Sequence, residues 1–118
     1  MNQLILRGIV VGPVKTNCYF LKHKETGELV IVDPGAEADR IIYAIQQLQG
    51  TPVAVLLTHG HYDHMCAVHE LKEHYHIPVY AAKAEEHLLM DSVENLSGSW
   101  QGMPYTVKAN YYLEDREI

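Results

Sequence analysis

The sequence has few cysteines, few basic residues and no long hydrophobic run. Two cysteines among 118 residues indicate thiols in a reducing compartment rather than a disulfide framework. The 9 Lys and Arg residues against 15 Asp and Glu give a net charge of -6 without a basic stripe, which argues against a nucleic-acid partner. No segment approaches the roughly 18 consecutive apolar residues of a membrane helix, and the N-terminus has no basic leader before an apolar stretch. We therefore expect one cytoplasmic domain, residues 1–118, without a membrane partner.

The first part of the chain predicts three strands. Apolar and β-branched residues predict an opening strand over residues 3–11 and a second over 16–23. A continuous apolar run over 28–32 is typical of a strand buried on both faces. Because residues 25–27 supply turn chemistry, we expect the second and third strands to form a hairpin.

The middle of the chain predicts a β-α-β unit. The third strand ends at Asp33-Pro34-Gly35, because proline cannot continue the ladder and glycine permits positive φ. A helix follows over 37–49, where apolar residues recur with a 3.6-residue period and Gly50 provides the stop. Residues 52–58 then predict a buried strand parallel to the third. The chain is therefore of the α/β class.

The rest of the chain carries weaker patterns. A second helix is expected over 65–75 and a short strand over 78–81. A third helix over 84–90 and a loop over 92–104 follow. Residues 105–118 have the pattern of a strand, a turn and the beginning of another strand, and the last element has no partner in the sequence.

Histidine is unusually frequent, with 8 copies, of which three fall within six positions. The segment that holds them reads Thr58-His59-Gly60-His61-Tyr62-Asp63-His64. In extended backbone His59 and His61 project to one side and can reach one cation, while Asp63 and His64 suit a second about 3.5–4 Å away. Four solvated loop residues are the alternative, but this density directly after a buried strand favours a metal site. Imidazole and carboxylate donors suit zinc and also accept iron or manganese.

The same segment resembles the T-H-x-H-x-D-H signature of the metallo-β-lactamase superfamily. Two upstream segments are similar to the T-N-C-Y and V-D-P-G segments of its glyoxalase II-like (hydroxyacylglutathione hydrolase-like) members. They read Thr16-Asn17-Cys18-Tyr19 and Val32-Asp33-Pro34-Gly35. The resemblance implies an αββα sandwich, of which this chain forms the N-terminal half, a mixed sheet with flanking helices.

The resemblance also assigns roles in a site with two zinc ions. It makes His59 and His61 ligands of one ion and Asp63 and His64 ligands of the other, with Asp63 also counted as catalytic. It places Asp33 near the metals, where a carboxylate orients ligands through hydrogen bonds; a simple strand-ending turn is the alternative.

The activity implied by the resemblance is hydrolysis of a small ester, thioester or lactone by a metal-bound hydroxide. Tyr62 stands where flavodiiron oxygen reductases of the superfamily have a glutamate ligand, which favours a hydrolase over a redox enzyme. Cys66 departs from the glycine often found after the motif, so it either lies near the site or is a small buried hydrophobe.

Beyond His64 the resemblance is incomplete. The family needs a further histidine in a G-H-T-x-G-S-like segment, a bridging aspartate and a final histidine, and none of these segments occurs. The remaining histidines are expected to be exposed or locally bonded: His23, His69, His74, His76 and His87. We therefore expect the N-terminal half of a longer hydrolase; the alternative is a catalytically incomplete metal-binding module that needs a missing segment or partner chain. Half a sandwich would also expose a sheet face and promote homo-oligomers.

Overall fold

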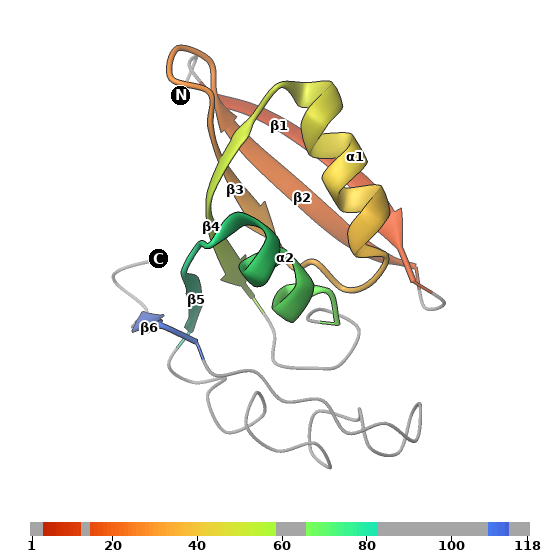
Figure 1. The fold of residues 1–118 in the computed structure, drawn as a ribbon, viewed down its shortest axis with the longest axis vertical. Helices are drawn as coiled ribbons and strands as arrows, with labels where there is room; N and C mark the ends of the chain where they lie inside the picture. Colours follow the sequence, from red (N-terminus) through yellow and green to blue (C-terminus); the bar gives the residue numbers. More distant parts are fainter. Residues whose placement is uncertain (1–3, 13–14, 59–65, 83–108, 114–118) are drawn as a thin grey trace.

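The computed structural model describes residues 4–12, 15–58, 66–82 and 109–113 (Figure 1). These residues form one six-stranded mixed sheet with two helices on one of its faces. The strands lie side by side in chain order: β1 (Leu4–Val11), β2 (Thr16–His23), β3 (Glu28–Val32), β4 (Thr51–Leu57), β5 (Val79–Ala82) and β6 (Tyr111–Leu113). The helices are α1 (Ala38–Leu48) and α2 (Val68–Tyr75).

The predicted directions are confirmed for the β2–β3 and β3–β4 pairs. The pairs β1–β2 and β2–β3 are antiparallel, which confirms the expected hairpin, and β3 to β6 run parallel. Helix α1 connects β3 to β4, as the predicted β-α-β unit requires, and α2 connects β4 to β5. Because both crossovers advance in the same direction across the sheet, right-handed connections put both helices on the same face.

The hydrophobic core lies between that face and the two helices. The strands contribute side chains that are at most 1% exposed, among them Phe20, Leu29, Ile31, Val55 and Leu57. Helix α1 covers them with Ile41 and Ile45, and α2 with Val68 and Leu71. The predicted apolar stripe of the first helix is therefore the stripe that packs.

The end of α1 differs from the expected glycine stop. Gln49, not Gly50, takes the left-handed conformation, with φ of 55°, and its backbone N–H donates to the Gln46 carbonyl at 3.1 Å. Gly50 is needed for space, since a Cβ atom there would lie 2.5 Å from Cδ1 of the buried Leu29. The glycine therefore marks a close approach between the helix end and β3.

Several expected elements lie outside the described residues: the helix over 84–90, the loop over 92–104 and the chain end after β6. Within 105–118, β6 pairs with β5 in parallel. Neither cysteine forms a disulfide, as expected. None of the helices in the described part of the chain is long and apolar enough to cross a membrane.

Candidate metal centre

The segment that carries the predicted ligands joins β4 to α2. His59, His61, Asp63 and His64 all lie outside the described residues. What the structure describes is the frame on either side of them, from Thr58 at the end of β4 to residues 66–67 before α2.

The frame begins where two parallel strands end together. Val32 of β3 is in register with Leu56 of β4, and the backbone N–H of Asp33 donates to the Leu56 carbonyl at 3.0 Å. This bond carries the ladder one residue past β3. Asp33 then takes φ of 52°, a left-handed conformation that is uncommon without glycine and that turns the chain out of the sheet. The strand ends where the sequence predicts, but the positive φ falls on Asp33 and not on Gly35.

The Asp33 side chain also binds Thr58, the residue that follows β4. It is 5% exposed, and its carboxylate accepts hydrogen bonds from the backbone N–H of Thr58, at 2.7 Å, and from the Thr58 hydroxyl. Because Thr58 directly precedes His59, this carboxylate sets the point at which the ligand segment leaves the sheet. Bonds from backbone N–H groups to a carboxylate are charge-assisted and among the stronger ones in proteins.

The same turn also holds the far end of the ligand segment. The Gly35 carbonyl accepts the backbone N–H of Cys66 at 3.1 Å, and the Pro34 carbonyl accepts that of Ala67 at 2.9 Å. Helix α2 begins at the next residue and has no side-chain cap, so these bonds tie down its start. The 33–35 turn therefore fixes both ends of residues 59–65.

No sequence signal marked these two carbonyls as anchors, because every residue has one. The sequence predicts a strand end at the 33–35 turn, and the resemblance places Asp33 near the metals, but neither predicts a contact with the start of α2. The turn's hydrogen bonds to the residues before α2 are found only in the structure.

A buried thiol lies behind the frame. Cys18 on β2 is fully buried, and burial, followed by the negative charge of Asp33, raises the pKa of its thiol to about 12. At neutral pH this side chain is therefore a neutral, apolar group of the core rather than a thiolate. Cys66 is half-buried at the end of the ligand segment.

The other described histidines come from α2, its C-terminal end and β2. His69 and His74 of α2 and His76, which caps it, are exposed, and the half-buried His23 accepts the N–H groups of Glu25 and Thr26 through Nδ1, both at 3.3 Å. These placements agree with the expectation of exposed or locally bonded side chains. His87 lies outside the described residues.

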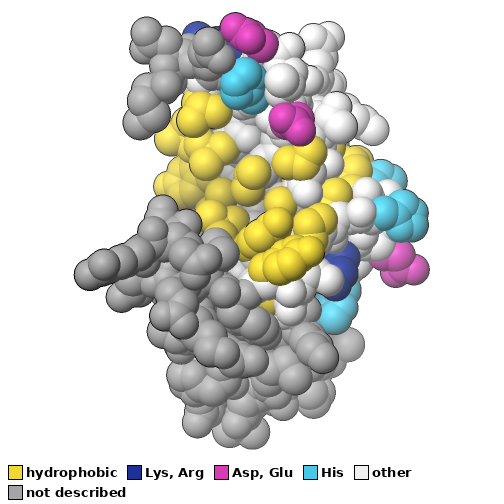
Figure 2. All heavy atoms as spheres, turned by 90° about the vertical axis from the view of Figure 1, so that its left-hand side faces the viewer, with side chains coloured by type: hydrophobic (Ala, Val, Ile, Leu, Met, Phe, Trp, Pro, Cys, Tyr) yellow, Lys and Arg dark blue, Asp and Glu magenta, His cyan; other side chains and the backbone are white. Residues whose placement is uncertain are grey.

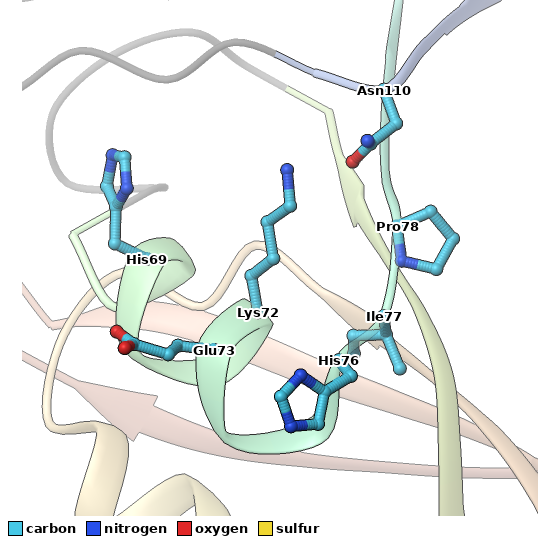
Figure 3. Close-up of a pocket in the computed structure, with 7 residues that line it drawn as sticks. All are labelled: His69, Lys72, Glu73, His76, Ile77, Pro78 and Asn110. Atoms are coloured by element: carbon cyan, nitrogen blue, oxygen red, sulfur yellow. The ribbon is translucent and has the colours of Figure 1, made fainter.

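A cavity of about 550 Å³ runs along the outer side of α2 (Figure 3). It is lined by His69, Lys72, Glu73, His76, Ile77, Pro78 and Asn110. Figure 3 shows that His69, Glu73 and His76 point in different directions from the helix. Among the described residues, no three His, Cys, Asp or Glu side chains are placed to hold a metal ion. The cavity is thus not the predicted centre.

A parallel β-α-β unit whose carboxyl edge leads into a histidine-rich segment defines an α/β domain with that segment where such sheets bind their ligands. Residues 11–115 match the model of the Metallo-beta-lactamase superfamily, and the chain belongs to that family. The resemblance inferred from the three motifs is confirmed.

Two curated relatives illustrate the match. The chain is 39% identical over 109 residues to the probable metallo-hydrolase YqgX of Bacillus subtilis, which covers 92% of this chain and 51% of the relative. It is 34% identical over 108 residues to the hydroxyacylglutathione hydrolase GloC of Haemophilus influenzae, covering 92% and 49%. The chain thus spans about half the length of the curated relatives it matches.

Solved structures agree with the fold. The B3 metallo-beta-lactamase BLEG-1 superposes with a TM-score of 0.83 at 39% identity, over 94% of this chain and 54% of that protein. The protein TTHA1623, solved in a di-iron-bound form, superposes with a TM-score of 0.74 at 27% identity, over 91% and 54%. The mixed sheet with two helices therefore matches the metallo-β-lactamase fold and corresponds to about half of these proteins.

Proposed function

We propose that this chain carries the first part of a metal-dependent hydrolase that cleaves a small ester, thioester or lactone in the cytoplasm. The observation that carries the proposal is the 33–35 turn, which holds both ends of the segment containing His59, His61, Asp63 and His64. Family membership and the similarity to a hydroxyacylglutathione hydrolase support hydrolysis, and a thioester is the substrate class to test first.

The donor set fits a pair of metal ions. Three imidazoles and one carboxylate follow a buried strand whose exit is fixed, which suits zinc and also iron. His59 and His61 would hold one ion, and Asp63 and His64 the other. A bound pair supplies Lewis acidity and lowers the pKa of water toward 7. The task of Asp33 is to keep the amide and hydroxyl of Thr58 in place, so that the ligand segment starts from a fixed point.

Metal binding is tested first, on the chain itself. We expect the chain to take up zinc in equilibrium dialysis, and we expect His61→Ala to lower the affinity by at least about 10-fold because one ligand is lost. His74→Ala is the matched control, since His74 is an exposed histidine on α2. Equal zinc affinity in both variants and the unchanged chain would contradict the assignment.

The positioning task of Asp33 needs a readout other than stability. Asp33→Asn keeps the size of the side chain but removes the charge that receives the Thr58 bonds. We expect a loss of metal affinity of about 10- to 100-fold, as for other groups that orient ligands. The visible spectrum of the cobalt-substituted chain should change with it, whereas Glu73→Gln on α2 should leave both unaltered. A destabilised variant with unchanged affinity and spectrum would reduce Asp33 to a structural turn.

A second candidate is a catalytically incomplete metal-binding module that needs a missing segment or a partner chain. The observation that favours it is coverage, since the chain spans about half of its relatives. Zinc-dependent cleavage of a hydroxyacylglutathione thioester by the 118-residue chain, lost in His61→Ala, would establish the hydrolase and exclude the module. Stoichiometric zinc binding without turnover would fit both candidates; an intact mass of the native protein near 13.4 kDa would then favour the module, and one near twice that would exclude it.

A further inference from the structure

A groove runs between α1 and β1, the strand at one end of the described sheet. Its volume of about 480 Å³ lies within the roughly 300–1,000 Å³ of small-molecule sites. The strands β1 and β2 supply its floor and α1 supplies a wall. The residues that line it are Arg7, Gly8, Ile9, Phe20, Arg40, Tyr43, Ala44, Gln47 and Leu48. None of these residues belongs to the 33–35 turn or to the segment of predicted metal ligands, so the groove is separate from the candidate metal centre.

The groove lies on the helix side of the sheet, where α1 covers β2 but not all of β1. Arg7 of β1 is in register with Phe20 of β2, and residues paired across two strands face the same side. Phe20 is 1% exposed, whereas Ile9 is half-buried and Arg7 is exposed. A strip of β1 therefore stays open beside the helix.

One stripe of α1 forms the wall of the groove. Its members recur at i, i+3, i+4 and i+7, which puts them on one helix face: Arg40, Tyr43, Ala44 and Gln47. From Arg40 to Leu48 the wall is about 12 Å long, at 1.5 Å per residue. Ile9 and Phe20 lie beneath it, and Tyr43 is 63% exposed at its rim. The groove is therefore an apolar channel that suits an extended hydrocarbon chain of medium length.

The charge of the groove is positive, although the chain as a whole carries a net charge of -6. Two of the three arginines in the sequence line it, and none of its nine described lining residues is acidic. Complementary charge favours a ligand with an anionic group.

The two arginines differ in their partners. The guanidinium group of Arg40 donates to the Val10 carbonyl at 2.9 Å and forms an ion pair of 3.1 Å with Glu37, so its charge is partly balanced. Arg7 donates to the Leu6 carbonyl at 2.9 Å and forms no ion pair within the described part of the chain. Because a guanidinium group has five donors in a fork that matches a carboxylate, Arg7 is the group to receive the anion.

We propose that this groove binds an amphiphilic carboxylate with an unbranched apolar chain of medium length. The carboxylate pairs with Arg7, and the apolar chain lies over Ile9 and Phe20, along Tyr43 and Ala44 of α1. The proposal does not rest on the proposed function, because no residue of the 33–35 turn or of the metal-ligand segment enters the argument.

Isothermal titration calorimetry of the metal-free chain with decanoate, below its micelle concentration, tests the proposal without the metal centre. Decyltrimethylammonium is the matched probe, since it has the same chain length and the opposite charge. We expect decanoate to bind at one site, and the cation to bind at least about 10-fold more weakly because it meets Arg7 and Arg40. Rising salt should weaken decanoate binding, since salt screens an exposed charge pair.

Two variants with matched controls place the ligand in the groove. Arg7→Gln should weaken decanoate binding about 5-fold, because an exposed charge pair is lost. Lys24→Gln removes the same charge from an exposed residue after β2 and should have no effect. Ala44→Leu should weaken binding at least about 10-fold, because the larger side chain takes the space of the ligand. Gln46→Leu adds the same side chain to an exposed position of α1 outside the groove and should leave binding unchanged.

Hydrophobic side chains elsewhere on the molecule are the competing site for the same ligand. Figure 2 shows a patch of them, with histidine and charged side chains around its margins. Leu6 is 58% exposed and, as the neighbour of Arg7 on β1, faces the other side of the sheet. Leu6→Ser should therefore leave decanoate binding unchanged.

Each outcome decides the proposal. Weaker binding in both Arg7→Gln and Ala44→Leu, with the three other variants unchanged and all proteins folded by circular dichroism, supports the groove. Absence of decanoate binding overturns the proposal, and so does equal binding of the cationic probe. Binding that Leu6→Ser weakens, or that neither Arg7→Gln nor Ala44→Leu affects, also overturns it and assigns the ligand to another apolar surface.

Discussion

The two faces of the sheet are built from the same strands and are similarly apolar, yet they differ in what covers them. Tyr19 and Phe20 are neighbours on β2, but Tyr19 is 40% exposed and Phe20 is 1% exposed. The side chain of Phe20 packs in the core beneath the helices, and because successive strand residues face opposite sides of a sheet, that of Tyr19 points away from them. Both faces therefore carry hydrophobic side chains that are stabilised by burial, and the position of the helices determines which face is covered.

This difference indicates which side chains contribute most to the free energy of unfolding of the described fold. Burial under α1 and α2 removes side chains such as Ile31 and Val55 completely from water. Each fully buried side chain of this kind contributes about 1.5–3 kcal/mol, whereas a half-exposed side chain contributes a fraction of that. Substitutions on the two faces of one strand should separate the contributions.

The largest contrast is expected between Phe20→Ala and Leu6→Ala. Removing the ring of Phe20 leaves a cavity in the covered core and should lower the free energy of unfolding by about 3–5 kcal/mol. Leu6 is 58% exposed, so its truncation in the monomer should cost less than about 1 kcal/mol.

Urea unfolding at concentrations low enough to keep the chain monomeric measures both changes. Equal losses for the two variants would show that a second layer covers the face even in the monomer, and the comparison between the faces would fail.

Two glycines give a smaller contrast across the same sheet. A Cβ atom on Gly50 would meet Cδ1 of Leu29 at 2.5 Å, and Leu29 is fully buried on the covered side. A Cβ atom on Gly8 would meet the ring of Tyr19 at 3.0 Å, but that ring is 40% exposed and can turn outward. We expect Gly50→Ala to destabilise the fold by about 1–3 kcal/mol.

Gly8→Ala should stay within about 0.5 kcal/mol of the unchanged chain, because the displaced ring has open space to move into. Thermal or urea unfolding of the two variants side by side checks the difference. If Gly8→Ala proves the more damaging, the Tyr19 ring is fixed by a partner and the face is not open.

Much of this fold could be predicted from the sequence because its central strands carry strong local signals. The bounds of β2 and β3 agree with the prediction, and α1 begins and ends within one residue of it. Continuous apolar runs and a regular 3.6-residue period are the patterns that local sequence records best. The parallel direction of β4 followed from the helix between it and β3.

The frame of the candidate site could be predicted only in part. Asp33 was expected near the metals, but its hydrogen bonds to Thr58 join residues 25 positions apart, and nothing local records such a contact. The hydrogen bonds that the backbone carbonyls of Pro34 and Gly35 accept cannot be predicted from residue types, because every residue has a carbonyl. The left-handed Gln49 was missed for a related reason, since Gly50 has the stronger preference for that conformation but was required for the approach to Leu29.

A pH dependence is also expected that belongs to the covered face alone. The pKa of the Cys18 thiol is raised from 9.0 to about 12, first by burial and then by the charge of Asp33. Above pH 9 the unfolded chain loses this proton while the folded chain keeps it, so stability that is fully present below pH 9 is lost as the pH rises toward 12. We expect a loss of about 1.4 kcal/mol per pH unit from this group.

Urea unfolding between pH 8 and pH 10, stated relative to Cys18→Ala so that tyrosine and lysine titrations cancel, should show this slope only with the cysteine present. Identical pH dependence in the two proteins would mean that Cys18 reaches water, and that the covered face is less closed than its packing indicates.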